Sequence, residues 1–238
     1  MKKLSLLLAL VFVFCITIPV FAESPTDTGK YKVVKSNKQI RDKDELIKRA
    51  IQQRVKGDKS KSFNSKQLLE EKLYDDGTIE ESYAADSVIV LDENNKQIDA
   101  SIVIALAASG YTYVDNSQSK SGGSGSVAFV HTLYYTMRYT PPYAQDMVYR
   151  VNRVETRIVQ QTGSSYAVSI EHGYHIFNDM SDYSNSSVVY YPSTGTAYTV
   201  YSNHSNFYPN SGRFGNQIYS YYYITISGGS VIQNTNQI

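Results

Sequence analysis

The amino-acid sequence predicts a mainly β protein. We expect a C-terminal antiparallel β-sandwich or barrel of about six to seven strands, preceded by a small α+β module with one helix. Two observations predict this arrangement. Every lysine lies at or before Lys120, whereas nineteen of the twenty-two tyrosines lie at or after Tyr111. Beyond residue 127 the apolar side chains recur with a period of two, which is typical of strands with one buried face.

The first 22 residues have the pattern of a secretory signal peptide. Lys2 and Lys3 precede an apolar run over residues 4–20, and residues 20–22 (V-F-A) present short side chains where a signal peptidase cleaves. The run is at the lower limit of the length that spans a bilayer, and no basic cluster follows it. We therefore predict a secreted, bacterial-type protein with no permanent membrane anchor after cleavage. Cleavage would remove Cys15, the single cysteine, so we expect a disulfide-free mature chain.

Residues 23–116 are predicted to form the small α+β module, with its helix over about residues 42–56. Asp42 is a suitable N-terminal cap, and Glu45 three residues later completes a capping-box pattern. Apolar residues then follow at spacings of three and four and give one stripe: Ile47, Ala50, Ile51 and Val55. Such a helix needs a surface to pack on, and we expect it to cover one side of a sheet.

Two hairpins complete this module in our prediction, over about residues 68–83 and 87–107. The first depends on Asp76-Gly77, because Asp-Gly between two such runs is typical of a tight turn whose residues take positive φ. Residues 117–126 read SQSKSGGSGS, a composition that cannot bury apolar area. This segment is predicted to be a domain linker or, alternatively, a long hairpin loop.

Residues 127–238 form the predicted tyrosine-rich all-β domain. Alternation is clearest over residues 127–140 and 165–177. We also predict a polar loop that contains Asn178, Asp179, Asp182 and Asn185, a hairpin between residues 187–191 and 197–201, and a last strand over residues 216–227. Tyrosine rings fill a core or stack across strands, while their hydroxyls stay in water or find a partner. Sheet packing is therefore the first explanation of the many tyrosines.

The charge balance predicts no nucleic-acid partner. Without Lys2 and Lys3, which signal cleavage would remove, the net charge of +1 becomes −1. A nucleic-acid-binding protein needs a basic face that neutralises phosphates. The N-terminal lysines are instead interleaved with acidic residues, as on a solvated surface.

The candidate catalytic residues are Glu171, His172 and His175. On a regular strand His172 and His175 point to opposite faces, so the two rings do not chelate one metal ion. Glu171 and His175 share a face and could form an ion pair, but the sequence identifies no third ligand. His172 falls on the apolar face of its strand, which favours a hydrogen-bonded core histidine over a catalytic one.

The candidate metal ligands are Asp179 and Asp182, because oxygen ligands suit calcium and secreted proteins meet calcium outside the cell. Their spacing lacks the EF-hand pattern and its closing glutamate, so a turn-rich loop with local hydrogen bonds is the favoured interpretation. We therefore predict no metal and no cofactor. The sequence also lacks the G-x-S-x-G, H-E-x-x-H and phosphate-binding glycine motifs.

These observations lead to three hypotheses. The first is a secreted, non-catalytic β-domain protein that binds a protein or a cell-envelope surface, because tyrosines give contact area at low entropic cost. The second is a membrane-active toxin whose β-hairpin over residues 127–158 forms a pore. The third is a secreted hydrolase that uses Glu171 with His172 or His175. The chain has no tryptophan, so protein binding is favoured over simple carbohydrate binding.

Overall fold

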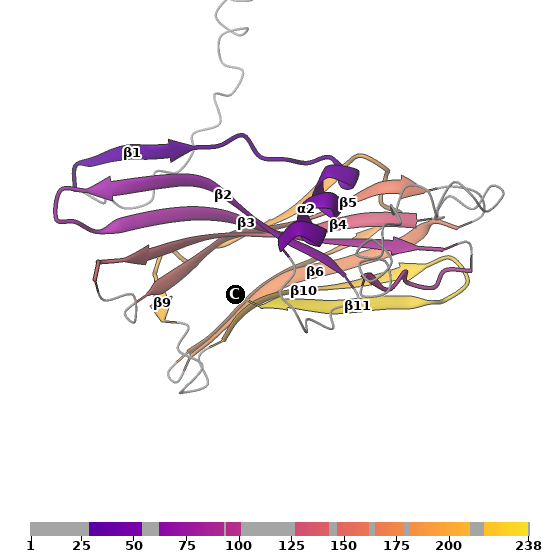
Figure 1. The fold of residues 1–238 in the computed structure, drawn as a ribbon. Helices are drawn as coiled ribbons and strands as arrows, with labels where there is room; N and C mark the ends of the chain where they lie inside the picture. Colours follow the sequence, from indigo (N-terminus) through magenta and orange to yellow (C-terminus); the bar gives the residue numbers. More distant parts are fainter. Residues whose placement is uncertain are drawn as a thin grey trace, which may run out of the picture.

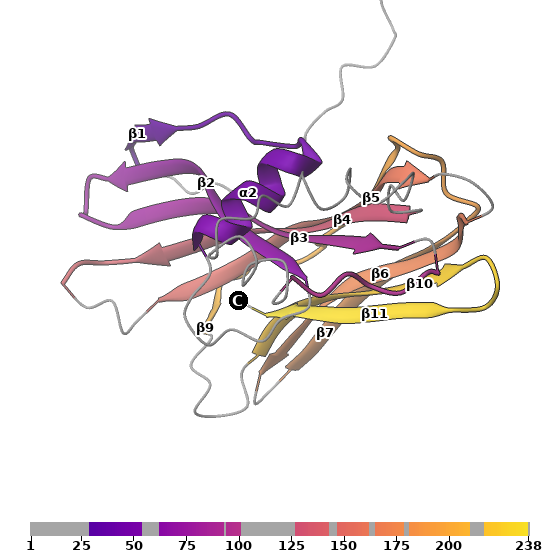
Figure 2. The ribbon, with the colours of Figure 1, turned by 45° about the vertical axis from the view of Figure 1, so that its right-hand side comes forward.

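The structure is a computed structural model that describes residues 29–53, 62–92, 94–100, 127–142, 147–161, 165–178, 181–209 and 217–237. These residues form two packed antiparallel sheets and helix α2. Figures 1 and 2 show the sheets as two layers, with α2 lying over the larger one. The predicted fold class, a β-sandwich preceded by a helix-containing segment, is confirmed.

The larger sheet has seven strands in the order β1-β2-β3-β4-β5-β8, and the short β9 also pairs with β5. Its strands are β1 (Tyr31–Ser36), β2 (Phe63–Tyr74), β3 (Ile79–Leu91), β4 (Val127–Tyr139), β5 (Val148–Gln161), β8 (Ala197–Tyr201) and β9 (Tyr208–Pro209). The smaller sheet has four strands in the order β11-β10-β6-β7. Its strands are β6 (Ala167–Asn178), β7 (Ser181–Tyr190), β10 (Gln217–Ile226) and β11 (Val231–Gln237). We call these the seven-stranded and the four-stranded sheet.

The two compositional halves of the chain share the seven-stranded sheet. β3 pairs with β4 along its whole length, from Ile79 opposite Tyr139 to Leu91 opposite Val127. Side chains of both strands also belong to one buried cluster. Strands of the predicted module over residues 23–116 and of the predicted domain over residues 127–238 are therefore neighbours in one sheet. Residues 117–126, predicted as a linker or a loop, lie outside the described residues.

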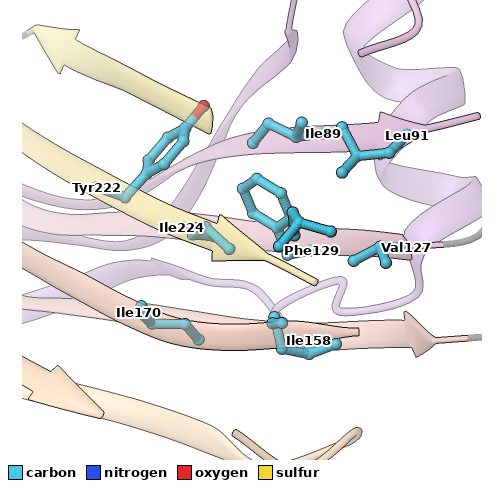
Figure 3. Close-up of a cluster of buried hydrophobic side chains, with 10 residues drawn as sticks. Ile89, Leu91, Val127, Phe129, Ile158, Ile170, Tyr222 and Ile224 are labelled. Carbon is cyan, nitrogen blue, oxygen red and sulfur yellow. The ribbon is translucent and has the colours of Figure 1, made fainter. Parts of the chain in front are cut away.

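The core between the sheets follows from alternation along the strands. In β10 the side chains of Ile218, Tyr222 and Ile224 are buried, and the tyrosines between them face outward. Figure 3 shows one end of this core, where the rings of Phe129 and Tyr222 meet edge to face at 5.4 Å between centroids. The remaining members of this cluster are Ile89, Leu91, Val127, Ile158, Ala167, Ile170, Ile224 and Ile226. Their burial is the main favourable contribution to folding.

Helix α2 (Lys43–Gln53) covers the outer face of the seven-stranded sheet, as predicted. Asp42 caps it, because Asp42 Oδ1 accepts hydrogen bonds from the backbone N–H groups of Asp44 and Glu45, each at 3.0 Å. The apolar stripe of the helix packs on side chains of β2, β3 and β4. The buried members of this contact are Leu46, Ile47 and Ala50 from the helix and Phe63, Val88, Val90, Ala128 and Val130 from the strands.

The predicted Asp76-Gly77 hairpin is confirmed, with β2 and β3 as its arms. Gly77 has a φ of 84°, and its N–H donates to the Tyr74 carbonyl at 3.0 Å. Asp76 is not in the left-handed region, and its carboxylate accepts a hydrogen bond from the Thr78 N–H at 2.8 Å. Only one of the two turn residues therefore has the positive φ that we expected of both.

The second predicted hairpin, over residues 87–107, is described only in part. Residues 87–91 belong to β3, and the Ile98 N–H donates to the Val90 carbonyl at 2.8 Å as the chain turns back. Residues 101–107 lie outside the described residues.

Two predictions for the chain after residue 177 are wrong. β7 begins at Ser181, so Asp182 and Asn185 lie in a strand rather than in a polar loop. β7 pairs with β6 in the four-stranded sheet, whereas β8 pairs with β5 in the seven-stranded sheet. Residues 187–191 and 197–201 therefore do not form a hairpin, and the chain crosses from one sheet to the other between them. β11 is an edge strand that its polar sequence did not indicate.

Candidate functional site

His172 lies inside the sandwich, in a layer of four polar side chains. The layer takes one side chain from each of four strands: His131 of β4, Thr156 of β5, His172 of β6 and Ser220 of β10. All four are buried, and His172 has a relative exposure of 0%. Along each strand the layer separates the cluster of Figure 3 from a second apolar cluster. The second cluster comprises Leu133, Tyr135, Val151, Val154, Tyr174, Ile176, Val200, Tyr208 and Ile218.

Hydrogen bonds join this polar layer into a chain across both sheets. Thr156 Oγ1 lies 2.9 Å from Nδ1 of His131 and 2.9 Å from Nδ1 of His172. Nε2 of His131 lies 2.9 Å from Oγ of Ser220. A hydroxyl donates one hydrogen bond, so Thr156 donates to one Nδ1 and accepts from the other. The two neutral histidines therefore hold opposite tautomers.

Burial keeps both rings uncharged at neutral pH. Burial lowers the pKa of His172 to about 4. Burial, together with the nearby His172, lowers the pKa of His131 to about 3. A general base must come within hydrogen-bond reach of its substrate, and His172 presents no exposed surface to one. The prediction of a hydrogen-bonded core histidine is confirmed.

Glu171 and His175 lie on the outer face of β6, opposite in direction to His172, as the alternation predicted. Nε2 of His175 contacts Oδ1 of Asp182 on the neighbouring β7, rather than Glu171. The His175 ring also stacks on Tyr219 of β10, with 5.2 Å between centroids and 22° between the ring planes. The structure thus divides the three candidate catalytic residues between two faces of one strand.

The candidate metal ligands are also not brought together. Asp182 contacts His175, and Asp179 lies outside the described residues. In the part of the chain that the structure describes, no three His, Cys, Asp or Glu side chains are grouped so that they could hold a metal ion.

The outer face of the four-stranded sheet carries a row of three tyrosines, and we call this surface the tyrosine face. Tyr219, Tyr221 and Tyr223 of β10 lie opposite His175, Gly173 and Glu171 of β6, respectively. The rings of Tyr221 and Tyr223 meet edge to face at 5.8 Å between centroids. The flanking strands complete the surface with Asp182, Ser184, Ser186, Val188 and Tyr190 from β7 and with Gln233, Thr235 and Gln237 from β11.

A hollow of about 560 Å³ lies on the tyrosine face. Its lining includes Glu171, His175 and the three tyrosines of the row. Gly173 lies between Glu171 and His175 on the strand, and a Cβ there would be 2.3 Å from the carbonyl oxygen of Asn185. The close approach of β7 therefore requires glycine, which also leaves Tyr221 without a side chain opposite it.

The tyrosine face has no lysine or arginine in its strands. None of the four strands of its sheet contains a lysine or an arginine, while Glu171 and Asp182 both lie on this face. The arginines of the second half that the structure describes lie on β4 and β5 instead: Arg138, Arg150, Arg153 and Arg157. The sequence analysis did not locate the tyrosine face because it treated the many tyrosines as one set and did not separate those that point inward from those that point outward. The alternation Tyr219, Tyr221, Tyr223 around the inward Tyr222 was the signal that could have found it.

Comparisons of the chain with protein-family models, with curated proteins and with solved structures found no match. Among the described residues, no helix has the length and apolar character needed to cross a membrane.

Proposed function

We propose that this chain is an exported, non-catalytic binding protein and that the tyrosine face is its contact surface for a protein partner with a basic surface. One observation carries this proposal. Tyr219, Tyr221 and Tyr223 form an outward row beside Glu171, on a sheet whose strands contain no lysine or arginine.

The chemistry of this row favours a cationic partner. Tyrosine rings attract ammonium and guanidinium groups through the negative charge of their faces, and carboxylates pair with the same groups. The molecule uses this contact internally, since the Arg153 guanidinium lies 3.8 Å from the ring centroid of Tyr134. Tyr223 is 42% exposed and Val188 is 49% exposed, so the face also offers apolar contact area.

The two alternative hypotheses receive less support from the geometry. A pore-forming hairpin over residues 127–158 would have to release β4, which is a central strand buried from Val127 to Met137. Its two faces pack against α2 and against the four-stranded sheet. A hydrolase would need Glu171 together with His172 or His175. The His172 ring is enclosed in the polar layer, and His175 contacts Asp182 rather than Glu171.

Binding to basic and acidic peptides of equal length tests the proposed surface. We expect a lysine- and arginine-rich peptide to bind the protein and the acidic peptide not to bind. Tyr221→Ala should weaken that binding at least about tenfold, as expected for an aromatic interface anchor. Tyr201→Ala is the matched control, because Tyr201 is 66% exposed on β8 of the other sheet. Equal loss in both variants, or equal binding of both peptides, would contradict the proposed surface.

Export is tested separately from binding. We expect a host that secretes the chain to release a protein whose N-terminal residue is Glu23, which N-terminal sequencing of the culture medium would show. Retention of an intact residue 1–22 segment in the cell would contradict export but would leave the binding surface to its own test.

A further inference from the structure

The two sheets do not cover each other completely, and a groove lies where the coverage ends. At the edge of the four-stranded sheet, Nδ2 of Asn236 on β11 donates to the Ala85 carbonyl of β3 at 3.4 Å. The seven-stranded sheet continues past this edge through β2 and β1. A groove of about 760 Å³ lies there. We call it the lysine groove, and its lining includes Arg49, Asn64, Lys66, Tyr83, Asn236 and Gln237.

Contacts of its backbone and of its ammonium group hold Lys66 in this groove. Its backbone N–H donates to Oε1 of Gln53 at 2.7 Å, and its carbonyl accepts from Nε2 of Gln53 at 2.9 Å and from Nε of Arg49 at 3.2 Å. Its ammonium lies over the ring of Tyr83, 3.9 Å from the centroid, and 5.5 Å from the centroid of Tyr135. The cation is therefore held before any ligand arrives.

The acidic side chains near Lys66 are engaged elsewhere. Glu81 accepts a hydrogen bond from the Tyr83 hydroxyl at 2.8 Å. Asp86 is buried, and its carboxylate accepts hydrogen bonds from Gln67 and Thr132, each at 2.7 Å. Among the described residues no ion pair joins a carboxylate to Lys66. Burial lowers the pKa of the Lys66 ammonium, and the attraction of Glu81 offsets this effect only in part.

We propose that the lysine groove binds a carboxylate-bearing sugar, with the carboxylate at Lys66 and Arg49 and the ring hydroxyls at the surrounding amides. This site is separate from the tyrosine face, because Lys66 belongs to the inner side of the overhanging β2, and it does not depend on the proposed protein partner. Gln237 at the end of β11 borders both hollows.

The lining decides the class of ligand. Among the described residues of the lining, two side chains are basic and the single carboxylate, that of Asp86, is 1% exposed, which favours an anionic ligand. The volume is that of a small-molecule pocket and far exceeds a bare phosphate ion. Side-chain amides such as Asn236 both donate and accept hydrogen bonds, as the hydroxyls of a sugar require. This groove would recognise its ligand through ion pairing and through hydrogen bonds to hydroxyls, so it does not need the stacking face of a tryptophan.

Titration of the ¹⁵N-labelled protein with glucuronic acid, followed by NMR, tests the site. We expect saturable shifts of the side-chain amide signals of Asn64, Asn236 and Gln237. Glucose and inorganic phosphate at the same concentrations should each give a Kd at least about tenfold higher, since each lacks one half of the recognised chemistry. A glutamate-rich peptide serves as a third comparison ligand.

Variants of Lys66 make the test specific. Lys66→Met keeps an unbranched chain over the Tyr83 ring and removes the charge, so we expect the Kd for glucuronic acid to rise at least about tenfold. Lys66→Arg should retain binding within about threefold, and Lys32→Met on the exposed β1 is the matched control that should leave it unchanged. Binding that survives Lys66→Met overturns the site. Equal or tighter binding of phosphate or of the glutamate-rich peptide overturns the ligand class.

Discussion

The two sheets of this sandwich use their outer faces in opposite ways. On the seven-stranded sheet, helix α2 covers the outer face and buries Phe63, Val88 and Val130. Beside the helix, that face carries charged contacts such as the ion pair between Arg41 and Glu155. The four-stranded sheet instead presents outward tyrosines, serines, His175 and two acids, without a lysine or arginine in its strands.

This difference shows that residue type does not decide the role of a tyrosine in this protein. Tyr222 is 1% exposed and packs on Phe129 and His131, whereas its neighbours Tyr221 and Tyr223 lie on the outer face of the same strand. Strand parity alone separates the core from the tyrosine face. The following changes test that separation, from the largest expected effect to the smallest.

Tyr222→Ala tests the face of β10 that points into the core. We expect it to lower the free energy of unfolding by about 3–5 kcal/mol, because it removes a buried ring and leaves a cavity beside Phe129. Urea unfolding followed by far-UV circular dichroism would measure the change. A loss below about 1 kcal/mol would show that the two sheets do not depend on this contact.

The polar layer between the sheets predicts a loss of stability in acid. The folded-state pKa values of His131 and His172, about 3 and about 4, lie below the ordinary value of 6.5. The unfolded chain therefore binds more protons as the pH falls below 6.5, and stability that is present above this pH is lost toward pH 4. We expect the free energy of unfolding to be about 3 kcal/mol lower at pH 5 than at pH 7.

A double variant isolates the histidine contribution to this pH dependence. Asp86 acts in the opposite direction, because burial raises its pKa and its folded form takes up a proton more readily than the unfolded chain. With His131→Gln and His172→Gln combined, the free energy of unfolding should change much less between pH 7 and pH 5 than in the original chain. An unchanged slope in this variant would assign the acid sensitivity to other groups.

Local patterns predicted much of this fold because they depend on neighbouring residues. The Asp42 cap, the apolar stripe of α2 and the Asp76-Gly77 turn each required only a few residues in sequence, and all three are confirmed. Alternation along β6 also placed His172 inward and His175 outward. Period two is a property of the strand itself, so no knowledge of its partner strand was needed.

Features that depend on distant partners could not be predicted in this way. The assignment of β7 and β8 to different sheets is set by their pairing with β6 and β5, which no local signal records. Along β5 a register shift near Asn152 places Tyr149 and Val151 in the core, while Arg153 pairs on the other side of the sheet. A fixed period of two would place these three side chains on one face, because it does not register a β-bulge.

The candidate site shows the same limit. Both the tyrosine face and the lysine groove are assembled from strands that lie far apart in sequence. Gln237 is near one end of the chain, yet it lines the same groove as Lys66, because β11 of one sheet lies beside the inner side of β2 of the other. Alternation along a strand predicts which side of the sheet each residue lies on. The packing of distant strands determines which residues it contacts there.

Gly173→Ala tests how closely β6 and β7 must approach under the tyrosine face. The new Cβ would lie 2.3 Å from the Asn185 carbonyl oxygen and 2.9 Å from Cβ of Ser186, so the strands must move apart. We expect a loss of about 1–3 kcal/mol in the free energy of unfolding, typical of overpacking. Ser184→Ala, an exposed change on the same face of β7, is the control that should have little effect. Equal stability of Gly173→Ala and the original chain would show that β7 yields freely.

Tyr221→Ala tests the outer face of β10 and should change the stability least. Its ring faces away from the core and contacts Tyr223, so we expect a loss of about 1 kcal/mol or less. The contrast with Tyr222→Ala, one residue away, would then measure the difference between the two faces of a single strand. Because the fold is preserved, the same variant separates stability from recognition in the peptide-binding experiment. A loss as large as that of Tyr222→Ala would mean that the tyrosine row holds the sheet together, and it would remove the structural argument for a contact surface.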